Sequence, residues 1–300
     1  MLAFHNDAQI KQQAVARAID DRRQDRFVKG RWLERSEDQS DVRGCHIGCL
    51  SRYYMNPDKA MSDDVVLDHW RFRAIERGLG LPVSWLNMFE RLYENMPLAK
   101  AATLSESLLE AIPVGADLEA AWNRFIGALN RFLMQEVPTD ADRYRYFAES
   151  TRNFRDLLFE GFSEIQWAVL KARELSKSDD PGDRYEQFEA LEDVAHSTEK
   201  FVANLADCEA MRRGPEESLE RDNWAVEYKQ AVWQQIAELL FHTLQAAPVP
   251  GEAAATEETH DLRLPAIQAE PPQLDIREVL SGPPHAGELL AGVIEHMNQE

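Results

Sequence analysis

The stretch between residues 139 and 246 most constrains the fold, because it is almost free of helix breakers. Three long segments, roughly 139–176, 183–212 and 216–246, carry apolar residues at helical spacing. The two breaks between them, SDDPGD and RRGPEE, each hold a glycine and a proline, which is typical of helix ends. No stretch alternates β-branched with polar residues as a strand would. We therefore expect an all-α fold, a multi-helix bundle with long C-terminal helices.

Shorter helices are predicted in the first half of the chain, where residues 27–43 are expected to be irregular with a surface loop. Proline in a first turn and aspartate at a cap position mark several of the helix starts. The expected helices cover residues 7–26, Asp63 or Asp64 to Gly78, Pro82 to Tyr93, Leu104 to Ile112, and a segment that begins after Asp117. In segment 183–212 the apolar residues Tyr185, Phe188, Leu191, Val194, Phe201, Leu205 and Cys208 repeat at heptad-like positions.

The composition changes at residue 247. The stretch APVPGEAAATEETHDLRLPAIQAEPPQL is rich in proline, alanine and acid and lacks aromatic residues, so it predicts a flexible acidic tail. We expect a helical domain over 1–246, a flexible linker over 247–285 and a short amphipathic helix over 286–300. A helix this short is marginal alone, so we predict that it docks on a partner or on a second copy of the chain. The predicted partner-binding residues are Leu289, Leu290, Val293, Ile294 and Met297.

The formal net charge is −20, which repels the phosphate backbone of nucleic acids. We therefore do not expect the protein to bind nucleic acid directly. The N-terminal quarter is mildly basic, while the last 120 residues carry most of the net negative charge, so a basic protein partner is expected. Three cysteines are too few for a disulfide scaffold, and no segment approaches the ~18 apolar residues of a membrane span. We expect a cytoplasmic protein in a reducing compartment. Assembly into a homo-oligomer is a further possibility that the sequence leaves open.

Residues 44–49, GCHIGC, are the stretch most suggestive of chemistry. If this segment is helical, Gly44 and Gly48 share one face, which would let another backbone approach closely while Cys45 and Cys49 fill the seam. A zinc site is the alternative, with Cys45, Cys49 and His46 as ligands and Cys208 or His69 as a distant fourth. A reactive thiol activated by Arg43 or His46 is a further alternative. We predict that both cysteines are reduced and largely buried.

Three segments together resemble a group of uncharacterised bacterial and bacteriophage proteins. They are GRW followed by RGCHIGCL, then ERGLGLPVSWLNMFERLYENMP, then LLEAIPVGADLEAAWNRF, and the resemblance covers roughly residues 30–130. The group carries a G-C-x-x-G-C element, an L-G-[IL]-P segment and an A-I-P-V-G-A-D segment in this order. The resemblance implies no activity and no catalytic residue, but it implies that the glycine-cysteine element recurs.

The sequence contains no phosphate-binding loop, no nucleophile elbow, no H-E-x-x-H and no dinucleotide fingerprint. Our first hypothesis is a non-enzymatic protein-binding or regulatory protein of bacterial or phage origin. It would act through its acidic helices and its C-terminal docking helix. The alternatives are a metal-dependent or thiol enzyme centred on GCHIGC, with His46 or His69 assisting, and an acidic DNA-mimic inhibitor.

Overall fold

The structure of the chain is a computed structural model. It describes residues 1–35, 42–55, 66–136, 154–178, 180–213 and 218–251. Within these ranges the chain is almost entirely helical, and the only strands are two residues long. The predicted all-α class is therefore confirmed.

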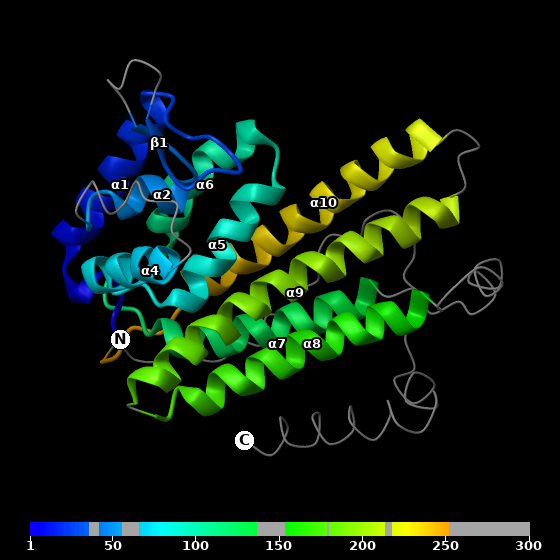
Figure 1. Cartoon of the computed structure of the whole chain (residues 1–300). Coiled ribbons are helices and arrows are strands. Elements are labelled where there is room, and N and C mark those ends of the chain that lie inside the picture. The colour runs from blue at the N-terminus through cyan, green and yellow to red at the C-terminus, as the bar shows by residue number, and fades with distance from the viewer. Residues whose placement is uncertain (36–41, 56–65, 137–153, 179, 214–217, 252–300) are drawn as a thin grey trace.

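The first half of the chain forms a lobe of short helices (Figure 1). A two-residue antiparallel ladder, β1 with β2, closes the segment that leads into α2. The elements of this lobe are η1 (Ala3–Asn6), α1 (Ala8–Arg23), β1 (Glu34–Arg35), β2 (Val42–Arg43), α2 (His46–Ser51), α4 (Val66–Leu79), α5 (Val83–Asn95) and α6 (Leu98–Ala111).

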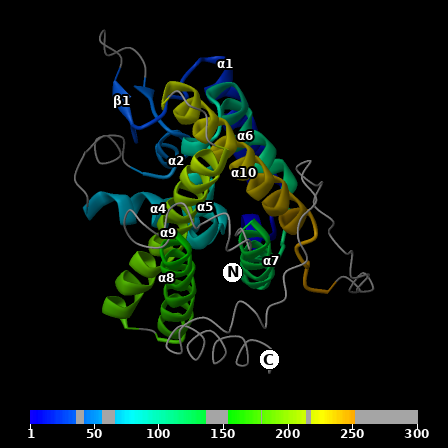
Figure 2. The same ribbon diagram turned by 90° about the vertical axis from the view of Figure 1, so that its right-hand side faces the viewer.

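The second half consists of four long helices, of which α8 and α10 pack against α9 and α7 packs against α10 (Figures 1 and 2). They are α7 (Leu118–Glu136), α8 (Phe154–Leu175), α9 (Pro181–Arg213) and α10 (Ser218–Gln245). Both predicted breaks mark helix ends, because α9 begins at Pro181 within SDDPGD and ends at Arg213 within RRGPEE, and the segments 183–212 and 216–246 match α9 and α10 closely. Asp117 caps α7 as predicted, because its carboxylate accepts the backbone N–H groups of Glu119 at 3.1 Å and Ala120 at 3.2 Å.

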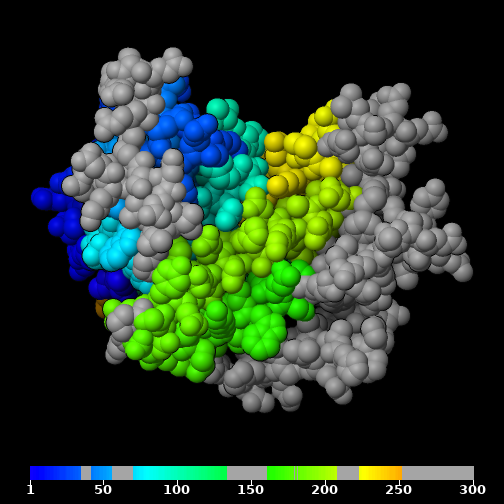
Figure 3. Space-filling view, viewed as in Figure 1, coloured from blue at the N-terminus to red at the C-terminus, as the bar shows by residue number. Residues whose placement is uncertain are grey.

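Helix α9 is the central helix of the long bundle. It packs against α8 along most of its length and also against α10 and α5. Because neighbours cover several of its faces, its apolar residues are spread around the helix instead of forming one stripe. Figure 3 shows that α8 and α9 together form one continuous outer surface of the molecule.

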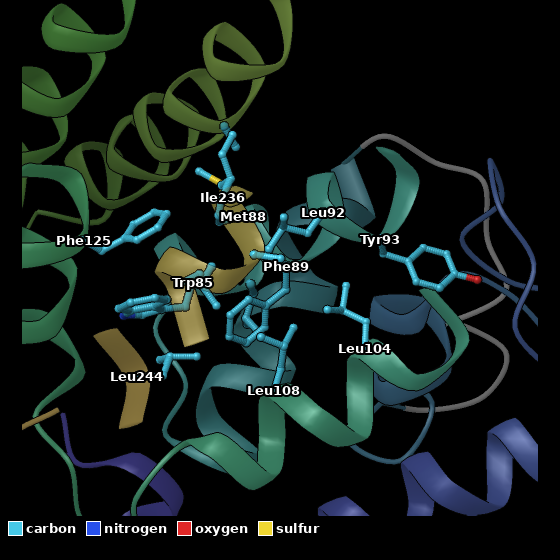
Figure 4. Packing of buried hydrophobic residues seen from close by; sticks show 14 of the residues in the cluster. Trp85, Met88, Phe89, Leu92, Tyr93, Leu104, Leu108, Phe125, Ile236 and Leu244 are labelled. Atoms are coloured by element: carbon cyan, nitrogen blue, oxygen red, sulfur yellow. The ribbon is translucent and has the colours of Figure 1, made fainter. Parts of the chain in front are cut away.

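The hydrophobic core is centred on α5, most of whose residues are buried. Trp85 is fully buried against the rings of Trp122 and Phe125, at centroid distances of 5.3 Å and 5.5 Å. Its indole N–H donates to the carbonyl of Leu118 at 2.8 Å, which ties α5 to the start of α7. Side chains of α5, α6 and α10 converge on this centre, among them Met88, Leu92, Leu104, Leu108, Ile236 and Leu244 (Figure 4).

The lysines of the basic N-terminal quarter are used inside the fold. Lys11 donates to the carbonyls of Glu110 and Ile112 at 2.8 Å and 2.7 Å, at the C-terminal end of α6. Lys29 donates to the carbonyl of Glu94 at 2.8 Å, at the end of α5. Cations at these positions satisfy the last carbonyls and oppose the negative end of the helix dipole. Both lysines therefore cap helix ends, and burial lowers the pKa of both.

The first residues of the chain form a left-handed turn. Phe4, His5 and Asn6 all have φ between 51° and 59°, a region that costs about 1–2 kcal/mol per residue. Phe4 is fully buried, and Gly80 and Gly115 lie so close to the turn that a β-carbon at either would overlap it. The packing of this turn between two interhelical loops holds the backbone in the costly conformation.

Some sequence-based boundaries differ from the structure. Helix α6 begins at Leu98 instead of Leu104, directly after Pro97, because its first turn has the propensity for a helix but little of the apolar pattern. Pro82 is the N-cap of α5 and not its first helical residue, since its ψ of 145° is extended. Residues 27–43, expected to be irregular, contain the β1–β2 ladder, which is too short to leave an alternating pattern.

Two further differences concern the long helices and their end. Tyr185, which repeats with the heptad-like residues of α9, is 48% exposed and hydrogen-bonds Glu189 instead of packing inward. The folded body also continues past residue 246, because Ala247 is buried and the carbonyl of Pro248 accepts the N–H of Asp117 at 2.7 Å. Segment 252–300, with most of the predicted linker and the predicted terminal helix, lies outside the described residues.

Candidate functional site

The glycine-cysteine element forms the start of α2. Cys45 is the N-cap residue, with an extended backbone, and its sulfur accepts the N–H of Gly48 at 3.4 Å. Every residue of the following helix, His46–Ser51, is buried. The helix packs against α1, α4 and α5, so the element lies at the junction of the N-terminal lobe and not at its surface.

Both glycines of the element face the backbone of Trp32. A β-carbon at Gly44 or at Gly48 would overlap the carbonyl oxygen of Trp32, far inside van der Waals contact. Trp32 has little freedom to retreat, because its ring meets Phe72 edge-on at 5.6 Å and the Arg71 guanidinium lies 5.3 Å from the ring centre. The predicted close approach of another backbone is confirmed.

The two thiols are sealed in the core and are not joined in a disulfide. The Cys49 thiol donates to the carbonyls of Gly44 at 3.5 Å and Arg26 at 3.7 Å. Burial raises the pKa of Cys49 to about 12 and that of Cys45 well above its usual range. Because the thiolate is the nucleophile and the metal ligand, both side chains are in the unreactive form at neutral pH. The predicted burial of reduced cysteines is confirmed.

His46 is also enclosed: the residue is 3% exposed, and its ring lies edge-on to Tyr93 at a centroid distance of 5.1 Å. Neither ring nitrogen of His46, nor the hydroxyl of Tyr93, has a hydrogen-bond partner in the part of the chain that the structure describes. Burial lowers the pKa of His46 to about 3, so the imidazole is neutral over the physiological range. It therefore cannot supply the positive charge that would activate a neighbouring thiol.

A buried ionic network adjoins the element on the side of Cys49. The carboxylate of Asp21, on α1, accepts hydrogen bonds from Arg52, from Arg26 at 3.1 Å and from the Tyr53 hydroxyl at 3.0 Å. Burial raises the pKa of Asp21, although the two arginines and the tyrosine lower it. The sequence gives no local signal for this network, because Asp21 and Arg52 are separated by 31 positions.

This network leads to a prediction for Arg52→Met. Removing one cation leaves Asp21 buried with fewer partners, so we expect a loss of about 1–2 kcal/mol of unfolding free energy at pH 7.5. The change raises the pKa of Asp21 further above its unfolded value. The loss of unfolding free energy therefore has its full size at a pH above the pKa of Asp21 in the folded variant. It becomes smaller at lower pH, because the carboxyl is then protonated. Urea unfolding at pH 7.5 and pH 5 measures both values.

The matched control for this prediction is Arg23→Met, which removes an exposed arginine from α1, the helix that carries Asp21. We expect it to change the unfolding free energy by less than about 0.5 kcal/mol at either pH. An Arg52→Met loss equal to that of the control would show that the network contributes nothing measurable.

The described part of the chain contains no group of three or more His, Cys, Asp or Glu side chains placed to hold a metal ion. The side chains of Cys208 and His69, the predicted distant fourth ligands, are not among those that the structure describes, although their backbone lies in α9 and α4. Zinc ligation by Cys45, Cys49 and His46 thus stays a prediction. The burial of these three residues is accounted for by the close packing of α2 against its neighbours.

The other predicted site lies in the undescribed C-terminal segment. Leu289, Leu290, Val293, Ile294 and Met297 all fall there. None of the described helices combines the length and the apolarity needed to cross a bilayer. Comparison of the chain with models of protein families, with curated proteins and with solved structures gave no match.

Proposed function

We propose that this protein acts by binding another protein and not by catalysis at the glycine-cysteine element. The observation that carries the proposal is Trp167 of α8, whose side chain is 65% exposed although tryptophan is a residue of cores and interfaces. Tyr185 of α9 and Trp70 of α4 are also about half exposed. Exposed aromatic side chains on rigid helices are typical of binding surfaces.

The chemistry of the glycine-cysteine element supports the same proposal. Protonated thiols and a neutral, enclosed histidine are poor nucleophiles and poor bases, because each would have to be ionised or uncovered first. Their burial is explained by the close contact of α2 with Trp32. The outer surface of the bundle is therefore the part of the protein to which we assign the binding function.

The test is affinity purification of the tagged full chain from cells that express its gene, followed by reconstitution with each purified candidate partner. We expect a near-stoichiometric protein partner whose dissociation constant is unchanged by Cys45→Ser, because serine also caps a helix and Cys45 does not reach the surface. Elemental analysis runs in parallel. Stoichiometric zinc that Cys45→Ser loses, together with the absence of any partner, would favour the metal-enzyme alternative.

The predicted terminal helix gives a separate prediction. Deleting residues 286–300 removes the apolar stripe from Leu289 to Met297. We expect the thermal midpoint of the bundle to stay within about 1 °C, because the predicted linker separates the predicted terminal helix from the bundle. We expect partner affinity or self-association to fall.

Calorimetry and sedimentation measure these two effects of the deletion. A large drop in the midpoint of a monomeric protein would place the helix in its own core, contrary to the prediction. The control is deletion of residues 298–300, which leaves the stripe intact.

A further inference from the structure

We propose that the outer face of the α8–α9 hairpin binds a lysine- or arginine-rich segment of a partner protein, with Trp167 as the anchor. This inference rests on the proposed function and names the surface and the chemistry of the partner. The outer face is defined by Glu164, Trp167 and Lys171 of α8 and by Glu186, Glu189 and Asp193 of α9, all of them exposed.

The geometry of the hairpin places Trp167 in the middle of this face. Glu164, Trp167 and Lys171 follow one another at i, i+3 and i+7, so they share one stripe of α8. The stripe borders α9, because Glu164 lies 4.0 Å from Lys200 and Lys171 lies 4.0 Å from Glu186. Trp167 is therefore flanked by charged groups of both helices.

The carboxylates of Glu164 and Glu186 are accessible to new partners. At 4.0 Å the two cross-helix pairs are longer than hydrogen bonds, and all four of their side chains are about half exposed. Glu189 and Asp193 continue the acidic row along α9. Over residues 161–207 acidic residues outnumber basic ones by more than two to one. This balance favours a cationic partner and opposes an anionic one.

Tryptophan surrounded by carboxylates is a combination suited to ammonium and guanidinium groups. The indole face attracts a cation more strongly than other aromatic rings do, and adjacent carboxylates add charge-assisted hydrogen bonds. The opposite side of α8 buries Phe162, Ile165 and Ala168 against the bundle, which fixes the helix and keeps Trp167 outward. The platform is thus preorganised, which limits the entropy lost on binding.

The experiment measures binding of labelled peptides to the full-length protein by fluorescence anisotropy. The probe is an 18-residue amphipathic peptide of lysine and leucine, and its twin carries glutamate in place of lysine. We expect saturable binding of the basic peptide that weakens with salt, and much weaker binding of the acidic twin. Trp167→Ala and the double variant Glu186→Gln/Glu189→Gln should each lower the affinity about tenfold or more.

Two control variants change exposed residues of helices that lie apart from this face. Leu98→Ala on α6 removes an apolar side chain that is 52% exposed, and Glu227→Gln removes a charge from α10. Both should leave the affinity unchanged. Because Trp167 is mostly exposed, Trp167→Ala should fold with a thermal midpoint near that of the wild type.

Three outcomes would overturn the inference: no saturable binding, equal binding of both peptides, or basic-peptide binding that Trp167→Ala leaves intact. Sedimentation adds a fourth, since a dimer that Trp167→Ala converts to a monomer would assign the face to a second copy of the chain. The proposed function fails separately, when purification yields no partner. A partner that binds Trp167→Ala as tightly as wild type would leave that function standing and remove this face from it.

Discussion

Replacing Gly48 with alanine is expected to destabilise the protein by more than about 3 kcal/mol. The new β-carbon would overlap the Trp32 carbonyl oxygen, which is a backbone atom and cannot rotate away as the end of a side chain could. Moving that carbonyl would disturb the contacts of the Trp32 ring with Phe72 and Arg71. Relieving the overlap between residue 48 and Trp32 would therefore strain the contacts of the Trp32 ring with Phe72 and with Arg71.

The matched control is Gly127→Ala, also within a helix. At Gly127 of α7 an added β-carbon would meet only the end of the Arg131 side chain, at 3.7 Å. Alanine has the higher helix propensity, so this variant should be stabilised by up to about 1 kcal/mol. The comparison separates the effect of contact from the effect of propensity, since the same substitution has opposite signs at the two sites.

Urea unfolding followed by circular dichroism measures both variants. Failure of Gly48→Ala to accumulate as folded protein, while Gly127→Ala folds normally, agrees with the prediction. A Gly48→Ala loss below about 1 kcal/mol would mean that α2 and Trp32 can separate at little cost. The packing account of the glycine-cysteine element would then be wrong.

Acid is expected to destabilise the protein through His46. Its pKa is about 3 in the folded state, against ~6.5 in an unfolded chain, so between these values the unfolded state binds more protons. The unfolding free energy therefore falls as the pH falls below ~6.5, by up to about 1.4 kcal/mol per pH unit. At pH 5 the loss from this one residue should be about 2 kcal/mol.

The variant that tests this prediction is His46→Phe, which keeps a flat ring beside Tyr93 but cannot be protonated. The difference in unfolding free energy between wild type and variant, measured from pH 8 to pH 5, isolates the titration of His46. This difference also removes the opposing contributions of Asp21 and Glu94, whose raised pKa values favour the folded state in acid. We expect the variant to gain about 2 kcal/mol relative to wild type over that range.

Tyr93→Phe is the control, because it removes a buried hydroxyl without a partner among the described residues and leaves His46 in place. It should keep the full pH dependence of the wild type and lose no stability at pH 8. A His46→Phe curve parallel to that of the wild type would show that the imidazole is protonated equally in both states, contrary to its burial.

The features that the sequence determined are local. Helix breakers, caps and periodicity act within a few residues, so they predicted the all-α class, the ends of α9 and α10, and the cap at Asp117. Glycines and cysteines spaced by four residues similarly predicted that α2 would pack closely against another backbone. These predictions hold because the signal and the structure lie in the same few turns.

The tertiary structure decided which groups from distant parts of the chain meet. Lys11 reaches the end of α6 about one hundred positions away, and Asp21 meets Arg52 across 31 positions. The local pattern also did not show which backbone would lie against Gly48, which in the structure is that of Trp32. Tyr185 has the spacing of a core residue yet lies outside, and Trp167 lies on the exposed stripe of α8 between Glu164 and Lys171. Such choices depend on the free energy of packing whole helix faces together, which no short segment of sequence contains.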